Sequence, residues 1–497
     1  MDNLQSLAYF YPELILTVLI LACILYDLSI KKEDSSKVGW LLVAGLVIVS
    51  VAILFQGSQT ITSLFSNAIV LDPFASFFKL VIILSTIFVS IFSLYNNELD
   101  EYRMGEYFTL IGIVTFGLFL MVSSIDLIMV YLSIEIVSIM SFVLAGYLKQ
   151  NTRSNEAALK YVVYGAFSSG IMLFGLSYLY GLTGSTNFFK IQQAMTSSSE
   201  INNTAITLAV IMILTGFGYK ISAVPFHFWT PDVYEGSPTT ITAYLSVAPK
   251  AGALAMMIRF FNQVLADGGA IVENSAGSLP IVPWTDIISI MAVVTMTIGN
   301  VIAIQQDNIK RMLAYSSIAH AGYMLLSIPV VSGEGIYAIM LYVIVYLFMN
   351  LGAFFVVIII KNRTEGESYE DYKGLGWKMP AVGAMMTLFM VSLTGLPPTA
   401  GFVGKFYIFA SLIKAGDSFY WLAIAGGINS VISLYYYLKV VKVMYFEGDR
   451  EEFVILPETG PTIMLTLTAI PTLLLGIYWV PIADWIDKSL VMFIQTI

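Results

Sequence analysis

Runs of about twenty apolar residues recur along the whole sequence, and they constrain its fold more than any other feature. At about 1.5 Å per residue, a helix of that length crosses bilayer hydrocarbon about 30 Å thick. Lipid offers the backbone no hydrogen-bond partner, so the runs are expected to be helices. The 497 residues are 58% hydrophobic and 11% charged, whereas soluble domains are about 25% charged. The sequence therefore predicts an all-α, polytopic membrane protein.

The apolar runs predict about fourteen spans in a single membrane domain, 1–497. The N-terminal run has no basic leader or small-residue cleavage site, so it is expected to remain as the first span. The longest polar stretches, 183–203, 262–281, 361–379 and 446–460, are expected to be loops. The expected spans are 9–28, 38–56, 74–95, 106–124, 126–147, 158–182, 204–229, 239–261, 282–304, 310–330, 336–360, 380–413, 420–445 and 461–487.

Basic residues fall mainly on one side of these spans. If the first loop, with Lys31, Lys32 and Lys37, is cytoplasmic, most of the others share that side. The positive-inside rule then puts both termini on the opposite face. The shared side carries Arg103, Lys149, Arg153, Lys310, Arg311, Lys361, Arg363, Lys373, Lys378, Lys442 and Arg450, and the other side has Lys190, Arg259, Lys414 and Lys488.

The sequence is poor in residues that hold cofactors. The single cysteine, Cys23, excludes a Cys-ligated iron-sulfur cluster, an internal disulfide and a structural zinc site within the chain. Two histidines, His227 and His320, are too few for a bis-histidine haem unless they meet. The stretch GFGYKI, 216–221, lacks the third glycine of a dinucleotide fingerprint, and no P-loop occurs. We expect no metal, nucleotide or nucleic-acid site here.

Ionisable residues inside the expected spans need an explanation, because each costs about 2.5 to 3.5 kcal/mol at a helix centre. Lys79 and Lys160 lie near span ends, where their long side chains are expected to snorkel to the interface. Glu135 lies mid-span and is too short to do so. It either lies on a functional pathway or is a neutral carboxyl that joins two helices.

Two other spans carry polar groups at depth. Lys250 lies at the middle of its span after Pro249 and before small residues, which favours a hydrated, switchable proton carrier. In the span 310–330, the residues Ser316, His320, Tyr323 and Ser327 share one helical face. That face is either a relay with His320 as its titrating member or a stripe of interhelical hydrogen bonds.

Two spans are interrupted by proline and glycine, which predicts broken helices. Pro225 should end a helix just after Lys220, and "GLPPTAGFVGK" should break another just before Lys405. Irregular backbone at membrane depth implies a polar interior. His227, beside the first break, is either a partner of Lys220 or part of a capped turn.

Such a pair of breaks indicates inverted repeats. We predict three N-terminal helices in 1–105, a first five-helix repeat in 106–261, an inverted second repeat in 282–445 and a last helix in 461–487.

Several long motifs, in order, resemble the antiporter-like membrane subunits of respiratory complex I, the proton-pumping NADH:quinone oxidoreductase. The resemblance implies fourteen helices with two inverted five-helix repeats, each with one discontinuous helix. The motifs are YPELILTVLILACILYDL, YLSIEIVSIMSFVLAGY, EAALKYVVYGAFSSGIMLFGLSYLYGLTG, AVPFHFWTPDVYEGSPTTITAYLSVAPKAGA, DNIKRMLAYSSIAHAGYML and GLPPTAGFVGKFYIF.

The resemblance also implies site residues. Glu135, Lys220, Lys250 and Lys405 match the family's charged axis. Lys405 separates the chain from subunit M, which has a glutamate there, and the chain lacks the long lateral helix of subunit L. The resemblance implies FMN, iron-sulfur clusters and quinone in partner subunits, with no redox centre here. It implies subunits K, M and J as neighbours in a bacterial inner membrane, with the termini on the periplasmic side.

Our hypothesis from the sequence is a proton pathway through Glu135, Lys220, Lys250, His320 and Lys405, with His227 beside it. Glu135 and Lys220 would form an ion pair whose separation changes the proton affinity of Lys220. Two alternatives stay open. One is an Mrp-type cation/proton antiporter subunit. The other is a passive scaffold whose buried charges only pack helices.

Overall fold

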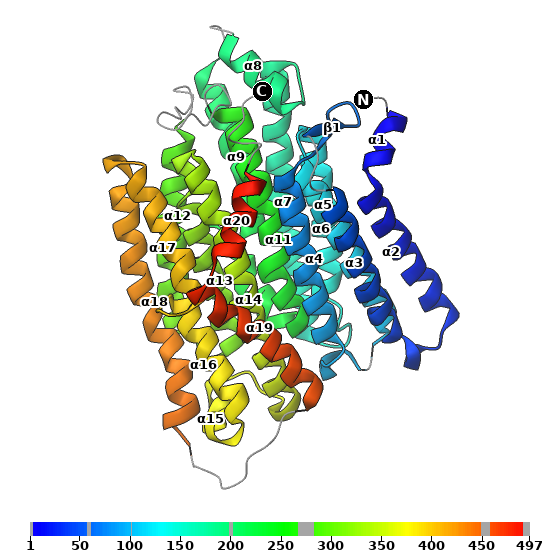
Figure 1. Ribbon diagram of the computed structural model, residues 1–497, viewed down its shortest axis with the longest axis vertical. Helices are drawn as coiled ribbons and strands as arrows, with labels where there is room; N and C mark the ends of the chain where they lie inside the picture. The colour runs from blue at the N-terminus through cyan, green and yellow to red at the C-terminus, as the bar shows by residue number, and fades with distance from the viewer. Residues whose placement is uncertain are drawn as a thin grey trace.

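The computed structural model describes residues 3–56, 61–100, 102–197, 202–266, 283–448 and 458–490. Within these ranges, thirteen helices are long and apolar enough to cross a membrane. Figure 1 shows them packed side by side in one bundle. We call the end of the bundle beside helix α8 the α8 face and the opposite end, beside α15, the α15 face. The all-α membrane fold is thus confirmed. Arg450 and most of the predicted loops 262–281 and 446–460 lie outside the described residues.

Four helices precede the predicted first repeat, and a small hairpin lies among them. Strands β1 and β2 pair antiparallel, with Thr62 opposite Leu71. Asp72 then caps the next helix by accepting a hydrogen bond of 2.6 Å from the backbone N–H of Ala75. The hairpin is a departure from the purely helical prediction. The elements are α1 (Asn3–Tyr9), α2 (Tyr11–Ser29), η1 (Lys32–Asp34), α3 (Lys37–Gln56), β1 (Thr62–Leu64), β2 (Ile69–Leu71), α4 (Pro73–Ser93) and η2 (Asn97–Leu99).

The first broken helix lies in the next group of elements. The predicted loop 183–203 contains a short helix, α8, so it is not wholly irregular. The elements are α5 (Met104–Ser123), α6 (Leu127–Ala145), α7 (Thr152–Thr183), α8 (Phe188–Ser197), α9 (Asn203–Ile221), α10 (Trp229–Gly236), α11 (Thr239–Phe260) and η3 (Phe261–Leu265).

The last group contains the second broken helix. Its long helix, α14, has 32 residues, as α7 does in the group before. The predicted loop 361–379 holds two short helices, η5 and α15. The elements are α12 (Trp284–Ile304), α13 (Ile309–Leu325), η4 (Ile328–Val330), α14 (Gly333–Thr364), η5 (Tyr369–Tyr372), α15 (Leu375–Lys378), α16 (Pro380–Thr394), α17 (Ala400–Lys414), η6 (Asp417–Phe419), α18 (Tyr420–Phe446), α19 (Thr459–Ile477) and α20 (Val480–Ser489).

Both predicted breaks are confirmed, with shifted boundaries. Helix α9 ends at Ile221, where Ser222 takes a left-handed conformation with φ +66°, so the expected span 204–229 is too long. Helix α16 ends at Thr394, and Gly395 follows with φ +88°. The chain is helical again from Ala400, so Gly401 and Gly404 lie inside α17 rather than in the break. The exact limits of the two repeats stay a prediction.

Three helices form the enclosed centre of the bundle. The membrane-crossing parts of α11 and α13 are wholly buried and that of α14 is 94% buried, whereas that of α3 is 33% buried. A helix that is apolar all round belongs in an interior or in lipid. The central helices carry Lys250 and His320, so these polar groups are screened from lipid by the outer helices.

Candidate functional site

Lys220 lies in the last turn of α9, at the first break. Its side chain is 2% exposed, and its Nζ donates a hydrogen bond of 3.0 Å to the Oγ of Ser138 on α6. The break is held from both sides, because Thr295 accepts from the backbone N–H of Val224 and Trp229 donates to the carbonyl of Tyr219. The sequence placed Lys220 correctly at the end of a helix.

Glu135 and Lys220 do not form an ion pair in this structure, so their alternate pairing and separation stay a prediction. Glu135, on α6, accepts a hydrogen bond from the hydroxyl of Ser169 on α7. It acts on Lys220 electrostatically but lies outside ion-pair contact. Ser138, three residues from Glu135, accepts the hydrogen bond from the ammonium of Lys220 instead. The acid and the lysine thus belong to one polar neighbourhood and are held apart by two serines.

Lys250 lies inside α11 and is 1% exposed. Its Nζ donates to both oxygens of Ser317 on α13, at 2.9 Å to the carbonyl and 2.6 Å to the hydroxyl. The ring of Tyr234 lies on another side, with its centroid 6.0 Å from Nζ. Lys250 therefore reaches across from α11 to the helix that carries His320.

His320 is held between two tyrosines. Its Nδ1 lies 2.7 Å from the hydroxyl of Tyr342 on α14, and its Nε2 lies 2.9 Å from that of Tyr437 on α18. The Tyr437 hydroxyl also lies 2.5 Å from the Oγ of Ser316. The side chain of His320 is 1% exposed and feels the charges of both Lys250 and Lys405. His320 is therefore within electrostatic reach of both lysines.

Lys405, on α17, is 4% exposed and points at the end of the other half of its broken helix. Its Nζ donates to the carbonyls of Leu393 and Thr394, at 3.2 and 2.8 Å, and to Ser430 at 3.0 Å. The last carbonyls of a helix carry partial negative charge and attract cations. The break therefore supplies the acceptors that hold this lysine.

Tyr323 connects His320 to Lys405. The centroid of the Tyr323 ring is 4.4 Å from the Lys405 Nζ and 5.9 Å from the His320 ring. Ser327, expected on the same helical face, lies just beyond the end of α13, and its hydroxyl is 3.1 Å from that of Ser411. The polar face predicted from the sequence is therefore buried and points at α14, α17 and α18.

His227 lies apart from these groups. It falls between α9 and α10, and its ring packs against Phe228 with centroids 4.4 Å apart. Neither ring nitrogen is hydrogen-bonded to Lys220, which donates to Ser138. The structure thus brings Lys220, Lys250, His320 and Lys405 onto the neighbouring helices α9, α11, α13 and α17 and leaves His227 at the edge of the break.

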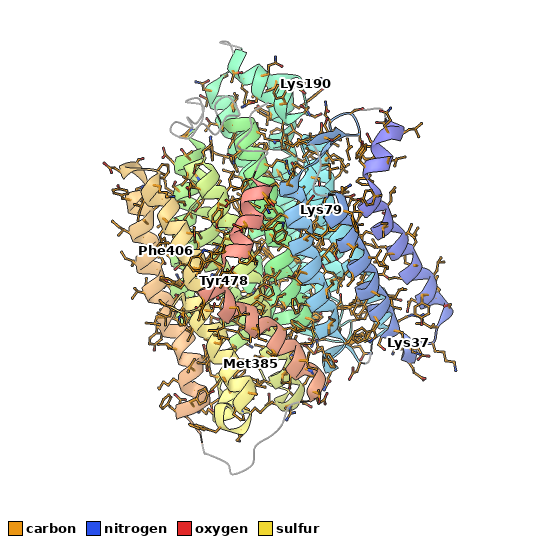
Figure 2. All side chains as sticks on the ribbon, in the orientation of Figure 1. Lys37, Lys79, Lys190, Met385, Phe406 and Tyr478 are labelled. Carbon is orange, nitrogen blue, oxygen red and sulfur yellow. The ribbon has the colours of Figure 1, made fainter. Side chains whose placement is uncertain are left out.

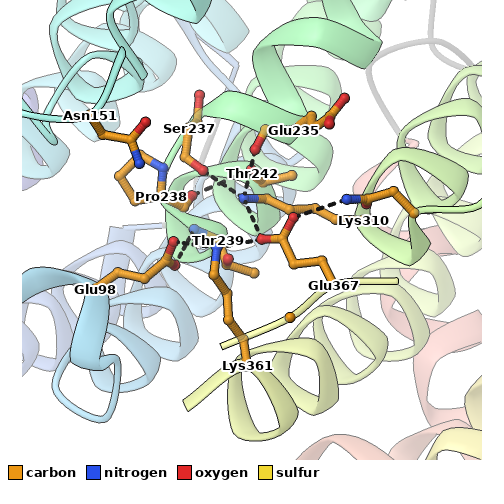
Figure 3. A network of polar contacts seen from close by, with 12 residues as sticks. Glu98, Asn151, Glu235, Ser237, Pro238, Thr239, Thr242, Lys310, Lys361 and Glu367 are labelled. Carbon is orange, nitrogen blue, oxygen red and sulfur yellow. Dashed lines mark hydrogen bonds and ion pairs between the residues drawn. The ribbon is translucent and has the colours of Figure 1, made fainter. Parts of the chain in front are cut away.

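A cluster of charges lies on the α15 face, where α10, α13 and α14 meet (Figure 3). Lys361 bridges Glu98 and Glu367, at 2.7 Å to Glu98. Lys310 donates 2.7 Å to the carbonyl of Ser237 and lies 3.4 Å from Glu367. Burial opposes the charge of Glu98, but Lys310 and Lys361 outweigh it and lower its pKa to about 2. They also hold the pKa of Glu367 below its usual value, against burial.

Two fully buried ion pairs escaped the sequence analysis. Lys79 was expected to snorkel, but it is 3% exposed and its Nζ lies 2.5 Å from Oε1 of Glu13 on α2. Figure 2 shows Lys79 within the height of the bundle, between the ends marked by Lys190 and Lys37. Arg259, assigned to an outer loop region, is 0% exposed and binds both oxygens of Asp72, at 2.7 and 3.1 Å.

Lys160 behaves as predicted. Its side chain stays 37% exposed and reaches the carboxylates of Asp232 and Glu156, at 2.6 and 2.8 Å. The buried tyrosines around His320 were missed, although Tyr342 and Tyr346 are spaced one turn apart in an apolar helix. Two tyrosines one turn apart in an apolar helix are a pattern from which their inward position could have been predicted.

Comparisons with known proteins place these features in a family. The model of the family described as NADH:quinone oxidoreductase/Mrp antiporter, TM, matches residues 124–433. The chain is 44% identical to NADH-quinone oxidoreductase subunit N 2 of Chloroherpeton thalassium, over 97% of this chain and 94% of that protein.

Two solved structures share its fold. A chain of respiratory complex I from Thermus thermophilus with bound aureothin has a TM-score of 0.77 and 25% identity, covering 96% of this chain and all of that one. A chain of the Mrp complex from Dietzia sp. has a TM-score of 0.82 and 19% identity, covering 98% of each chain.

Proposed function

The chain belongs to the subunit N group of the NADH:quinone oxidoreductase/Mrp antiporter membrane family, and on that premise we propose that it translocates protons in the membrane arm of NADH:quinone oxidoreductase. Redox chemistry in partner subunits supplies the energy. The iron-sulfur clusters belong to those partners, because one cysteine, Cys23, cannot ligate a cluster. We assign the FMN and the quinone to the partners as well.

One observation carries the proposal. The Nζ atoms of Lys220, Lys250 and Lys405 are buried and donate only to neutral oxygens of serines and of the backbone. The buried Lys79, by contrast, is paired with a carboxylate. A buried ammonium without a counter-ion is expensive, and it exchanges its proton readily when a nearby charge changes. Three such lysines in one bundle suit proton transfer better than packing.

The serines around the first break suggest how transfer is controlled. Glu135 rests on Ser169 and Lys220 on Ser138, so the pair is separated here. Closing that gap would hold the proton on Lys220, and opening it would release the proton towards Lys250. His320 and Tyr323 then lead to Lys405. Moving one charge against 100 mV costs about 2.3 kcal/mol, which about two units of change in pKa would match.

The test replaces Lys250 by methionine in the assembled complex. NADH oxidation drives proton uptake into vesicles, and we expect Lys250→Met to lower the protons moved per electron. Lys414→Met is the matched control, because Lys414 is 62% exposed and pairs with Glu334 at the surface. Normal pumping by a fully assembled Lys250→Met complex would remove Lys250 from the pathway.

The Mrp-type alternative and the scaffold alternative make other predictions. The Mrp structure shares the fold at 19% identity, against 44% for the subunit N relative, so the first proposal is favoured. Co-purification with a flavin and iron-sulfur assembly supports it, whereas cation-dependent proton exchange without those cofactors supports the Mrp reading. A passive scaffold predicts unchanged pumping after separate neutral replacements at Glu135, Lys220, Lys250 and Lys405.

The assembly and orientation are also proposals. We propose subunits K, M and J as neighbours in a bacterial inner membrane. The α15 face, with Lys37, Lys361 and Arg311, would be cytoplasmic by the positive-inside rule, so the α8 face and both termini would be periplasmic. We further propose 106–261 and 282–445 as the two inverted repeats, each with one broken helix.

A further inference from the structure

A file of buried hydroxyls runs between α4, α5 and α11, away from the lysines of the proposed pathway. At one level, the hydroxyl of Tyr107 lies 2.8 Å from both Thr240 and Ser93. At the next level, the Oγ1 of Thr115 lies 3.0 Å from the hydroxyl of Tyr244 and 3.1 Å from Thr86. All six side chains are buried.

Four polar side chains lie in one row along α4. Lys79, Thr86, Ser90 and Ser93 are separated by seven, four and three residues, so they lie on one face of the helix. Thr240 and Tyr244 are likewise one turn apart on α11. The two hydroxyl clusters are therefore one turn apart on α11, but about two turns apart on α4, from Thr86 to Ser93, and on α5, from Tyr107 to Thr115.

Two further hydroxyls on α4 stand beside the file. The Oγ atoms of Ser85 and Ser90 are buried and have no hydrogen-bond partner among the described residues. Leaving a buried hydroxyl unpaired costs about 1 to 3 kcal/mol, and internal water commonly satisfies such groups. If the hydroxyls of this file served only to join helices, the unpaired hydroxyls of Ser85 and Ser90 would have no role. Ser90 lies between the levels of Thr86 and Ser93, where the file would bind water.

Ionisable groups stand at both ends. At the α15 end, Glu98 accepts a hydrogen bond of 2.9 Å from the backbone N–H of Thr239 and acts electrostatically on Tyr107. Glu98 also lines a cleft of about 650 Å³, together with Arg153, Lys361 and Glu367. Towards the α8 end stands the buried Glu13–Lys79 pair. The file thus lies between a charged surface cleft and a buried acid and base, and internal water between its levels would complete the route.

We propose that α4, α5 and α11 form a second proton path, from the Glu98 cleft through Tyr107 and Tyr244 to the Glu13–Lys79 pair. Each hydroxyl gives its own proton onward and accepts one from behind. Lys79 passes a proton to the carboxylate of Glu13 and regains one from the file, and Glu13 releases its proton at the α8 face. The path deepens the proposed function, because the same complex drives it, but it uses none of the residues Lys220, Lys250 or Lys405.

The test measures protons moved per electron by the complete complex in vesicles. Tyr244→Phe removes one hydroxyl and keeps the ring, and Glu13→Gln removes the acid and keeps its shape. We expect each to lower the ratio while NADH oxidation continues. The double variant should lose no more than the larger single loss, because both changes interrupt one path. Additive losses would contradict a single path.

Controls separate transport from packing. Ser50→Ala also deletes a hydroxyl from the N-terminal helices, since Ser50 on α3 donates 2.7 Å to the carbonyl of Val47, but it lies outside the file; its ratio should equal that of the wild type. A ratio that is unchanged in assembled Tyr244→Phe and Glu13→Gln complexes overturns the path. If Lys250→Met still lowers the ratio in that case, the proposed function stands without the second path; if it does not, both fall.

A spectroscopic measurement that begins with the wild-type complex tests the role of Glu13 without relying on pumping by the variants. Infrared difference spectra of the wild-type complex should show a carboxyl band that responds to NADH addition and disappears in Glu13→Gln. A purely structural ion pair would give no such band, which would overturn the role of Glu13.

Discussion

The imidazole of His320 and the hydroxyl of Tyr437 are 2.9 Å apart and join α13 to α18 in the interior. On the other side, Tyr342 lies 2.7 Å from the same ring. A neutral imidazole has one donor and one acceptor nitrogen, so one tyrosine accepts and the other donates. Protonating His320 requires both tyrosine oxygens to accept. Only the hydroxyl that donates to the neutral ring must therefore rotate when His320 takes up a proton.

Tyr437→Phe should uncouple this exchange. The variant leaves Nε2 of His320 and Oγ of Ser316 without their shared partner, at a cost of about 1 to 3 kcal/mol in stability. We expect fewer protons per electron at near-normal NADH oxidation, measured in vesicles. Tyr435→Phe is the control, because Tyr435 is 62% exposed on the same helix. Equal pumping by the two variants would count against the His320 relay.

Gly395→Ala should damage the Lys405 site. Gly395 has φ +88°, and a Cβ there would lie 2.8 Å from Cδ of Lys405. Backbone strain of this kind costs about 1 to 3 kcal/mol, and the lysine must move. We expect a lower melting temperature of the complex and weaker pumping. Gly427→Ala is the control, since a Cβ at Gly427 meets nothing within 4 Å. If both variants kept the melting temperature and the pumping of the wild type, the close contact between Gly395 and Lys405 would be contradicted.

Arg259→Lys should destabilise the junction of α11 and α4. The guanidinium binds both oxygens of Asp72, and lysine cannot reproduce that geometry. Breaking a fully buried pair costs about 3 to 5 kcal/mol, so thermal unfolding should occur at lower temperature. Lys37→Met breaks the exposed Lys37–Asp34 pair and should change stability by less than about 1 kcal/mol. Similar losses in both variants would argue against the buried pair as a main stabilising contact.

Glu98→Gln should change how stability depends on pH. The folded pKa of Glu98 is about 2, against an ordinary value of 4.5, because Lys310 and Lys361 outweigh the effect of burial. A lowered folded pKa gives stability that is complete above pH 4.5 and is lost as the pH falls towards about 2. At 1.36 kcal/mol per pKa unit, the lowered pKa of Glu98 contributes at most about 3 kcal/mol to the stability of the folded state.

The measurement follows unfolding of the purified complex across that pH range. The wild type should be more stable than Glu98→Gln above pH 4.5, and the difference should shrink as the pH falls. Glu370→Gln, at a carboxylate whose side chain is 76% exposed, is the control and should show little difference. If the difference in stability between the wild type and Glu98→Gln grew as the pH fell, the lowered pKa of Glu98 would be refuted.

Local chemistry made some of the site predictable. Pro225 and the prolines that follow Gly395 favour breaks because proline removes a backbone donor, although Pro249 stays inside the unbroken α11. The positions of Lys220 and Lys405 beside the predicted breaks followed from the sequence. Mid-span polarity pointed to Lys250 and His320 because lipid penalises such groups. Lys79 was misjudged by the same logic: its place in the span was read correctly, but its partner, Glu13, is 66 residues away.

By itself, the sequence determined the membrane class, the membrane-crossing helices, the two breaks and the mid-span lysines Lys220, Lys250 and Lys405, since each depends on a bilayer that excludes unpaired polar groups. Only the tertiary structure decided the partners. It separated Glu135 from Lys220, joined His320 to Tyr342 and Tyr437, and paired Arg259 with Asp72. Those contacts lie across helices, where side-chain direction and packing rather than local pattern set which donor meets which acceptor.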